Sequence, residues 1–171
     1  MKRAMHKIKL TIFASLLVFL SACGWHLRGQ VDVPVAYRIL DLQANKATPL
    51  TQKLLRQSLL SNGITLSADA PYTLLITNEE SDRRTLAVTS NAKASEYELT
   101  ETLSFKLVDT INQLTSDNID VVSYRTLQYD ASAEIGKAQE EQNLRREMKQ
   151  SNAYNILLRL KAVKLNPIQG Q

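Results

Sequence analysis

The chain has 171 residues and a formal net charge of +4, from 21 Lys and Arg against 17 Asp and Glu. Four of the basic residues and none of the acidic ones lie in residues 1–22, so residues 23–171 carry 17 charges of each sign. This balance argues against a nucleic-acid partner, which requires clustered positive charge, and the length suits one domain with a hydrophobic core.

The first segment has the layout of a secretory signal peptide, with a basic start, an apolar run over residues 10–20, and small residues at Ser21 and Ala22. Cys23 follows, and the sequence Leu-Ser-Ala-Cys resembles the bacterial lipobox. In that family of signals the thiol receives a diacylglycerol, the peptide is cut before the cysteine, and the freed amine is acylated. The resemblance implies removal of residues 1–22 and an S-diacylglycerol and N-acyl group on Cys23, with no other cofactor.

Cys23 is the only cysteine, so it cannot close an internal disulfide, and the alternatives to lipidation are a buried free thiol or an intermolecular bridge. The apolar run is shorter than the ~20 residues that a spanning helix needs, so acyl chains are expected to anchor the protein. Gly24 follows the cysteine, whereas an Asp there resembles an inner-membrane retention signal in enteric-type bacteria. The sequence therefore predicts an outer-membrane lipoprotein.

Behind the signal peptide, residues 23–34 are interpreted as a lipidated N-terminal tether, residues 35–166 as a single α/β sandwich domain, and residues 167–171 as a short tail. His26 is the only histidine after residue 22. With no second cysteine beside it, a metal site is not expected.

The domain begins with a predicted strand over residues 35–42, which are apolar and β-branched. Thr48 is a good helix N-cap and Pro49 suits the first helical position. Leucines at helical spacing follow, and Asn62-Gly63 provides a left-handed helix end, which together predict an amphipathic helix. Residues 64–66 are interpreted as a short β segment.

A long extended region then alternates apolar and polar residues around a hairpin tip at residues 90–94. The charged residues 78–84 are a bulged, solvent-facing part of a strand or a loop, and the bulged strand is favoured. Over residues 95–108 one face is apolar, with Glu101 as the single exception, and the other face is polar. That pattern predicts a strand with one buried face and one face that is wet or available to a partner.

The last part of the chain is predicted to form a fourth strand over residues 120–130, a connection over residues 131–136, and a helix over residues 137–164 that Asn166-Pro167 ends. The second half of this helix has an apolar stripe, whereas its first half is polar. The element order predicts an α/β (α+β) fold, a two-layer sandwich of two helices packed on one face of a four-stranded mixed sheet.

Catalytic motifs are missing from the sequence. It has no Gly-x-Ser-x-Gly motif, and its five glycines form no phosphate loop. Glu96, Glu98 and Glu101 could mimic an acid/base pair but are expected to form a solvated array. The neighbouring Arg83-Arg84 is expected to form local ion pairs with Glu80 and Asp82. The sequence therefore predicts a binding role and no enzymatic activity.

A resemblance to a known family extends over the whole chain after residue 22. It consists of Cys23-Gly24-Trp25-His26-Leu27-Arg28, the leucine-rich helix ending in Asn62-Gly63, the strand start Ser95-Glu96-Tyr97-Glu98, and the late helix with Met148 and Leu157-Leu158-Arg159-Leu160. These features, in this order, resemble the LptE family of lipopolysaccharide (LPS) assembly lipoproteins. Members of that family have the sandwich predicted above.

The resemblance implies a non-enzymatic partner of the outer-membrane β-barrel LptD, which lies as a plug within the barrel and helps LPS reach the outer leaflet. It also implies LPS binding through basic residues near loop tips, and Lys93 and Lys137 occupy the corresponding stretches. The alternative for each is an ordinary solubilising lysine. Arg145-Arg146 is interpreted as a solvated helix face or a contact with the barrel wall.

Two other function classes remain open at this point. One is a generic outer-membrane lipoprotein adaptor that binds peptidoglycan or another envelope complex. The other is an envelope enzyme, which the missing catalytic triad and metal ligands disfavour.

Overall fold

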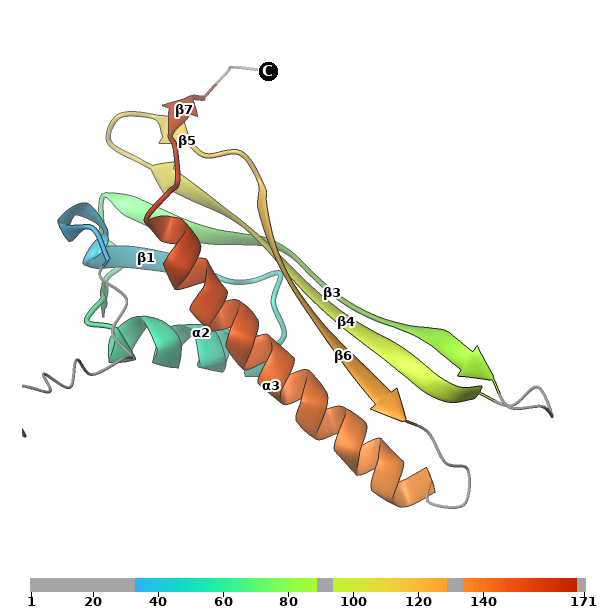
Figure 1. The fold of residues 1–171 in the computed structure, drawn as a ribbon. Helices are drawn as coiled ribbons and strands as arrows, with labels where there is room; N and C mark the ends of the chain where they lie inside the picture. The colour runs from blue at the N-terminus through green and yellow to red at the C-terminus, as the bar shows by residue number, and fades with distance from the viewer. Residues whose placement is uncertain (1–32, 89–93, 129–133, 169–171) are drawn as a thin grey trace, which may run out of the picture. The chain divides into compact units, whose positions relative to one another are not determined.

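The computed structural model describes residues 33–88, 94–128 and 134–168, in which two α-helices pack on one face of a mixed sheet (Figure 1). Its elements in chain order are η1 (Val35–Tyr37), β1 (Ile39–Gln43), α2 (Pro49–Ser61), β2 (Thr65–Leu66), β3 (Tyr72–Val88), β4 (Ala94–Asp109), β5 (Leu114–Thr115), β6 (Ile119–Gln128), α3 (Glu134–Leu160) and β7 (Asn166–Pro167). None of the helices in these three ranges has the length and hydropathy needed to cross a membrane.

The sheet has more strands than the four that the sequence predicts. Within the described ranges it has seven strands in the order β2-β1-β3-β4-β5-β7, and β6 pairs with β4 outside this path. The additional strands β2, β5 and β7 have two residues each; β2 lies in the short β segment predicted at residues 64–66, whereas β5 and β7 are too short to produce a visible alternation. Strand β1 runs parallel to β2 and β3 while the other pairs are antiparallel, so the predicted mixed sheet is confirmed. The two predicted α-helices are present as α2 and α3.

The start of the domain differs from the predicted strand over residues 35–42. Residues Val35–Tyr37 form a 3₁₀ turn, closed by a hydrogen bond of 2.9 Å from the Tyr37 N–H to the Pro34 carbonyl, and β1 begins only at Ile39. This turn places the Tyr37 ring edge-on against Tyr72, with centroids 5.1 Å apart. Val33, within the predicted tether, is buried in the core.

Helix α2 follows its sequence signals closely. Thr48 is the N-cap, its hydroxyl accepts a hydrogen bond of 3.4 Å from the Thr51 N–H, and Pro49 opens the helix. Leu55 and Leu59 are fully buried. Asn62 caps the C-terminus and Gly63 takes a φ of +77°, the left-handed conformation that glycine adopts without strain.

We predict that Gly63→Ala destabilises the protein by about 1–2 kcal/mol, because a Cβ is strained in the left-handed region. The added methyl group would meet no atom within 4 Å, so the cost comes from the backbone alone. Gly136→Ala is the matched control, since Gly136 lies within α3 and its Cβ also meets no atom within 4 Å. There the change is expected to stabilise by up to about 1 kcal/mol. Urea unfolding followed by circular dichroism measures both, and equal signs would contradict the prediction.

The long β3–β4 hairpin confirms the bulged strand. Ile76 pairs with Phe105, whereas Asn78 pairs with Ser104, so the register shifts at Thr77. This extra residue changes which side chains of β3 face the helices. Leu74 and Ile76 face them before the bulge, and Glu79 rather than Glu80 faces them after it. The tip at residues 90–94 lies mostly outside the described residues, but the pairing of Val88 with Ala94 confirms a hairpin.

Helix α3 begins and ends earlier than predicted. It starts at Glu134, so residues 134–136 are helical and not part of a connection, and it ends at Leu160 rather than at Lys164. The Ala162 N–H donates to the Arg159 carbonyl in a turn at 2.9 Å. The Asn166-Pro167 pair does not end the helix but forms β7 against β5.

Two apolar clusters lie between the sheet and the helices. The main core includes Leu40, Leu55, Leu59, Leu74, Ile76, Leu103, Phe105, Leu107, Val121, Ile156, Leu157 and Leu160. A smaller core consists of Leu99, Leu127 and Met148, with Tyr97 and Leu144 packed against it. It lies in the three-stranded arm, which we define as residues 78–88 of β3, residues 94–105 of β4, and β6 (Figure 1).

Candidate functional site

The three residues that the sequence singles out fall in different parts of the chain. Cys23 and Lys93 lie outside the described residues, so lipidation and the first LPS contact stay predictions. Lys137 lies in the first turns of α3, where its Nζ forms an ion pair of 2.8 Å with Glu140. Ile135 beside it is 90% exposed.

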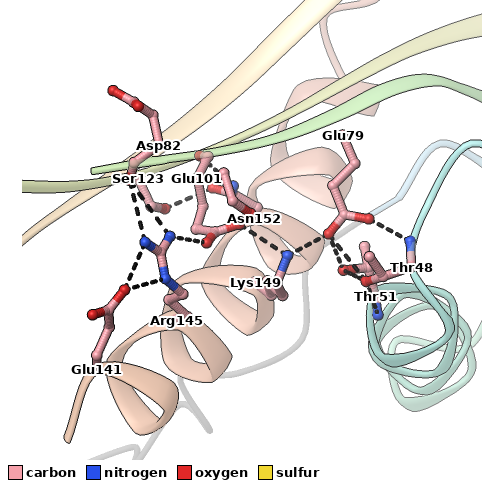
Figure 2. Close-up of polar contacts among 11 residues, drawn as sticks. Thr48, Thr51, Glu79, Asp82, Glu101, Ser123, Glu141, Arg145, Lys149 and Asn152 are labelled. Carbon is pink, nitrogen blue, oxygen red and sulfur yellow. Dashed lines mark hydrogen bonds and ion pairs between the residues drawn. The ribbon is translucent and has the colours of Figure 1, made fainter. Parts of the chain in front are cut away.

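A group of buried and partly buried charges that the sequence did not predict connects both helices to the sheet. We call it the ionic cluster, and it consists of Glu79 on β3, Glu101 on β4, and Glu141, Arg145 and Lys149 on α3 (Figure 2). In Figure 2 the two cations of α3 point toward the carboxylates of the strands.

Glu101 is at the centre of the ionic cluster and is only 1% exposed. Its carboxylate accepts hydrogen bonds of 2.7 Å from Arg145 Nη1, 2.9 Å from Lys149 Nζ, and 2.6 Å from the Ser81 hydroxyl. The expectation of a solvated array is therefore wrong for this residue. Removing a carboxylate from water is costly unless cations and hydrogen bonds compensate it, and here three donors do so.

Arg145 contacts three elements at once. Besides Glu101, its guanidinium pairs with Glu141 one turn earlier at 2.8 Å and reaches the Asp82 carbonyl at 3.4 Å. The expectation of a solvated face is therefore wrong for Arg145, whereas Arg146 is exposed.

The arginine pair on β3 also has partners other than those predicted. Arg83 pairs with Glu141 of α3 at 3.1 Å and lies 4.7 Å from the centre of the Tyr97 ring, while Arg84 pairs with Glu98 across the strands at 2.7 Å. For Arg83 the predicted pairing with Glu80 and Asp82 is wrong, because successive strand residues point to opposite faces. Arg84 shares the face of Asp82, whose charge acts on it, but its ion pair is formed with Glu98.

Lys149 extends the ionic cluster to Glu79, which in turn reaches the start of α2. The carboxylate of Glu79 accepts hydrogen bonds from Lys149 and the Thr48 N–H, and a bond of 2.6 Å from the Thr51 hydroxyl. Burial raises the pKa of Glu79, but these hydrogen bonds outweigh it and leave the pKa below its usual value. Burial likewise lowers the pKa of Lys149, yet its bonds with both carboxylates raise it overall.

A pair of neutral side chains, Ser123 and Asn152, lies next to the ionic cluster, and we call these two residues and the cluster together the polar layer. The Ser123 hydroxyl donates to the Asn152 side-chain carbonyl at 2.6 Å, and the Asn152 amide donates to the Glu101 backbone carbonyl at 2.8 Å. On β4, Glu101 lies between Leu99 of the smaller core and Leu103 of the main core. The polar layer therefore separates the two apolar clusters.

The ionic cluster holds fixed charges. The directions of the two pKa changes keep Glu79 and Lys149 ionised near neutral pH, so their contact is an ion pair.

Two hollows on the protein, of about 550 and 440 Å³, are lined by residues outside the ionic cluster, among them Asp117 in the first and Tyr154 in the second. Within the ranges that the structure describes, no three His, Cys, Asp or Glu residues are grouped to hold a metal ion. The ionic cluster therefore has the features of a structural element that holds α2 and α3 on the sheet.

The pKa of Glu79 predicts an acid-sensitive stability. Because its folded pKa is below its unfolded value, the folded state gains stability from this carboxylate above about pH 5 and loses it as the pH falls further. We expect Glu79→Gln to cost about 1.5–3 kcal/mol at pH 7, the range for hydrogen bonds to charged groups. The difference between the two proteins should shrink toward pH 3, as measured by urea unfolding. A difference independent of pH would contradict the ionised state of Glu79.

The fold is a small two-layer α/β sandwich in which two α-helices pack on one face of the sheet. Two solved lipoproteins have a similar fold. The minor lipoprotein from Acinetobacter baumannii aligns with a TM-score of 0.66 and 24% identity over 78% of this chain and 98% of that chain. The rare lipoprotein B from Shewanella oneidensis aligns with a TM-score of 0.62 and 20% identity over 72% and 94%. At these identities the likeness concerns the fold alone.

The chain belongs to the LptE family, described as lipopolysaccharide-assembly, whose model matches residues 37–160. The resemblance stated from the motifs is thus confirmed. The LPS-assembly lipoprotein LptE of Photorhabdus laumondii subsp. laumondii is 32% identical over 108 residues, which are 60% of this chain and 58% of that protein. The protein of the same name from Pectobacterium atrosepticum is 21% identical over 159 residues, 91% of this chain and 85% of that protein.

Proposed function

We propose that this protein is a non-enzymatic outer-membrane lipoprotein that lies as a plug in the LptD β-barrel, assists its assembly, and binds LPS on its way to the outer leaflet. The observation that carries the proposal is the family match, which runs from Tyr37 to Leu160 and covers both α-helices and every strand of the sheet except β7. Lipidation of Cys23 provides the membrane anchor.

The face of the sheet opposite the helices supports the plug. On β4 this face presents Glu98, Thr100 and Thr102, and on β6 it presents Asp120 and Thr126, with the exposed Val122 and Tyr124 between them. Because the lumen of an outer-membrane barrel is polar, a protein inside it needs hydrogen-bonding side chains on its surface. A sheet face of this composition meets that requirement.

Lys93 and Lys137 are proposed to pair with phosphates of LPS. The present partner of Lys137 is Glu140, whose side chain is 48% exposed, and an ion pair of this kind contributes little, with a median of about 0–1 kcal/mol. A phosphate group can therefore replace it at low cost. The neighbouring Ile135 is apolar and exposed, which suits an amphiphilic ligand.

Mild detergent extraction of the tagged protein from its native envelope tests the plug. We expect one large outer-membrane barrel in equal amount. Recovery of the lipoprotein alone would contradict the proposal, and recovery with peptidoglycan or a different envelope complex would favour a generic adaptor.

Binding of purified LPS to the detergent-solubilised protein tests the lysines. Lys93→Ala and Lys137→Ala are each expected to weaken binding by about tenfold, since hydrogen bonds to charged groups contribute about 1.5–3 kcal/mol. Lys53→Ala, an exposed change on α2, serves as the control. Equal affinity of all variants would show that these lysines only solubilise the protein.

A further inference from the structure

Strand β6 lies at an edge of the sheet. In the part of the chain that the structure describes, it pairs only with β4, from Glu96 opposite Gln128 to Phe105 opposite Ile119. It borders the three-stranded arm on the side away from β3 (Figure 1). An edge strand leaves the N–H and C=O groups of alternate residues without a strand partner, so β6 offers a row of main-chain donors and acceptors over 10 residues.

The opposite edge of the arm is protected by charge. Residues 78–88 of β3 pair only with β4 among the described residues and carry five charged side chains, which are Glu79, Glu80, Asp82, Arg83 and Arg84. Charged side chains on an edge discourage pairing with a further strand. This edge therefore has a feature that natural sheets use against strand addition.

The β6 edge lacks this protection. Its only charged residues are Asp120 and Arg125, and it contains no Pro, Gly or Lys. Five of its ten residues are β-branched or aromatic and favour extended pairing, namely Ile119, Val121, Val122, Tyr124 and Thr126. The two edges of the arm thus differ in charge and in β propensity, and of the two only β6 has the composition of a strand that accepts a partner strand.

Side chains on both faces of β6 indicate what kind of strand would fit. On the face opposite the helices, Val122 is 37% exposed and Tyr124 is 57% exposed, so apolar residues of an added strand could cover them. On the other face Arg125 is exposed; among the described residues it donates to the Tyr124 backbone carbonyl, at 2.8 Å, and pairs with no carboxylate. An acidic side chain on the added strand would supply that missing charge.

We propose that the free edge of β6 receives an extended segment of the barrel protein, which adds a strand to this sheet. The segment places apolar side chains beside Val122 and Tyr124 and a carboxylate near Arg125. Main-chain hydrogen bonds supply the attachment, and these side chains supply its selectivity. The identity of the donor rests on the proposed function, whereas the strand addition rests on the edge itself.

Residue-resolved amide hydrogen exchange tests the strand addition, in the purified protein in detergent and in native outer membranes. We expect alternate amides of β6 to exchange rapidly in the purified protein and at least about a hundredfold more slowly in the membrane, because a new hydrogen bond must open before exchange. The outward amides over residues 78–88 of β3 serve as the internal control and should change far less. Unchanged exchange on β6 in the membrane would overturn the proposal.

A pair of variants gives a second test in the full-length protein. Val122→Lys adds a charge to the open edge at a partly exposed position and is expected to reduce the co-purified barrel about tenfold. Glu80→Lys on the protected edge, also exposed, should leave recovery within about twofold. Circular dichroism confirms that both variants fold. Full recovery with Val122→Lys would contradict the attachment at β6.

The combined outcomes separate this inference from the proposed function. If the barrel co-purifies but the β6 amides are not protected from exchange, the proposed plug function stands and the added strand is refuted. Protected amides without a recovered barrel refute the plug and show that another chain supplies the strand. Cross-linking between two differently tagged copies through β6 would identify a second copy as the occupant and refute the barrel segment.

Discussion

Lys149→Met is expected to lower the free energy of unfolding by about 3–5 kcal/mol, the range for removing one partner of a buried ion pair. Glu79 and Glu101, whose side chains are 5% and 2% exposed, would lose a cation that both of them bind. Methionine fills a similar volume, so the loss reports the charge rather than a cavity. Urea unfolding of the detergent-solubilised protein, followed by circular dichroism, measures the effect.

The control is Lys53→Met on α2, which makes the same change at an exposed position and should shift stability by less than about 0.5 kcal/mol. A further variant adds Glu79→Gln to Lys149→Met. Because Glu79 then carries no charge and Glu101 keeps Arg145 as its cation, this double variant should recover part of the loss. A single variant as stable as the control would show that the ionic cluster contributes little, and a double variant that recovers nothing would show that the loss does not come from an unpaired carboxylate.

The sequence predicted those elements whose signals are local. Thr48, Pro49 and Gly63 are start and stop signals of one helix, and each acts through its own backbone conformation. The alternation over residues 95–108 likewise depends only on the period of a strand. The short β segment over residues 64–66 is present as β2, but the two-residue strands β5 and β7 were not predicted, because two residues carry no period and their pairing depends on distant segments.

The ionic cluster could be predicted only in part. Glu101 interrupts an apolar face, which was a signal of a buried charge, but its partners Arg145 and Lys149 lie 44 and 48 residues further along the chain. Glu79 gives no such signal. Its side chain faces the helices only because the bulge at Thr77 shifts the register of β3. Such contacts depend on tertiary geometry, which the sequence period does not encode.

Met148→Ala is expected to destabilise the three-stranded arm by about 2–5 kcal/mol, the range for truncating a buried methionine. Met148 is fully buried against Leu99 and Leu127, and the polar layer separates this smaller core from the main core. Because few apolar contacts hold the arm, we expect the loss to appear first as local opening. Amide exchange in residues 96–99 and 125–128 should then accelerate more than exchange around Ile76 and Phe105.

Leu160→Ala provides the comparison, since Leu160 is equally buried at the C-terminal end of the same helix but belongs to the main core. That change should accelerate exchange throughout the domain, because the main core joins α2, α3 and the sheet. If Met148→Ala produced the same uniform acceleration, the two cores would unfold together and the polar layer would not divide them. A selective effect would instead mean that the three-stranded arm, which includes β6, opens while the main core stays folded.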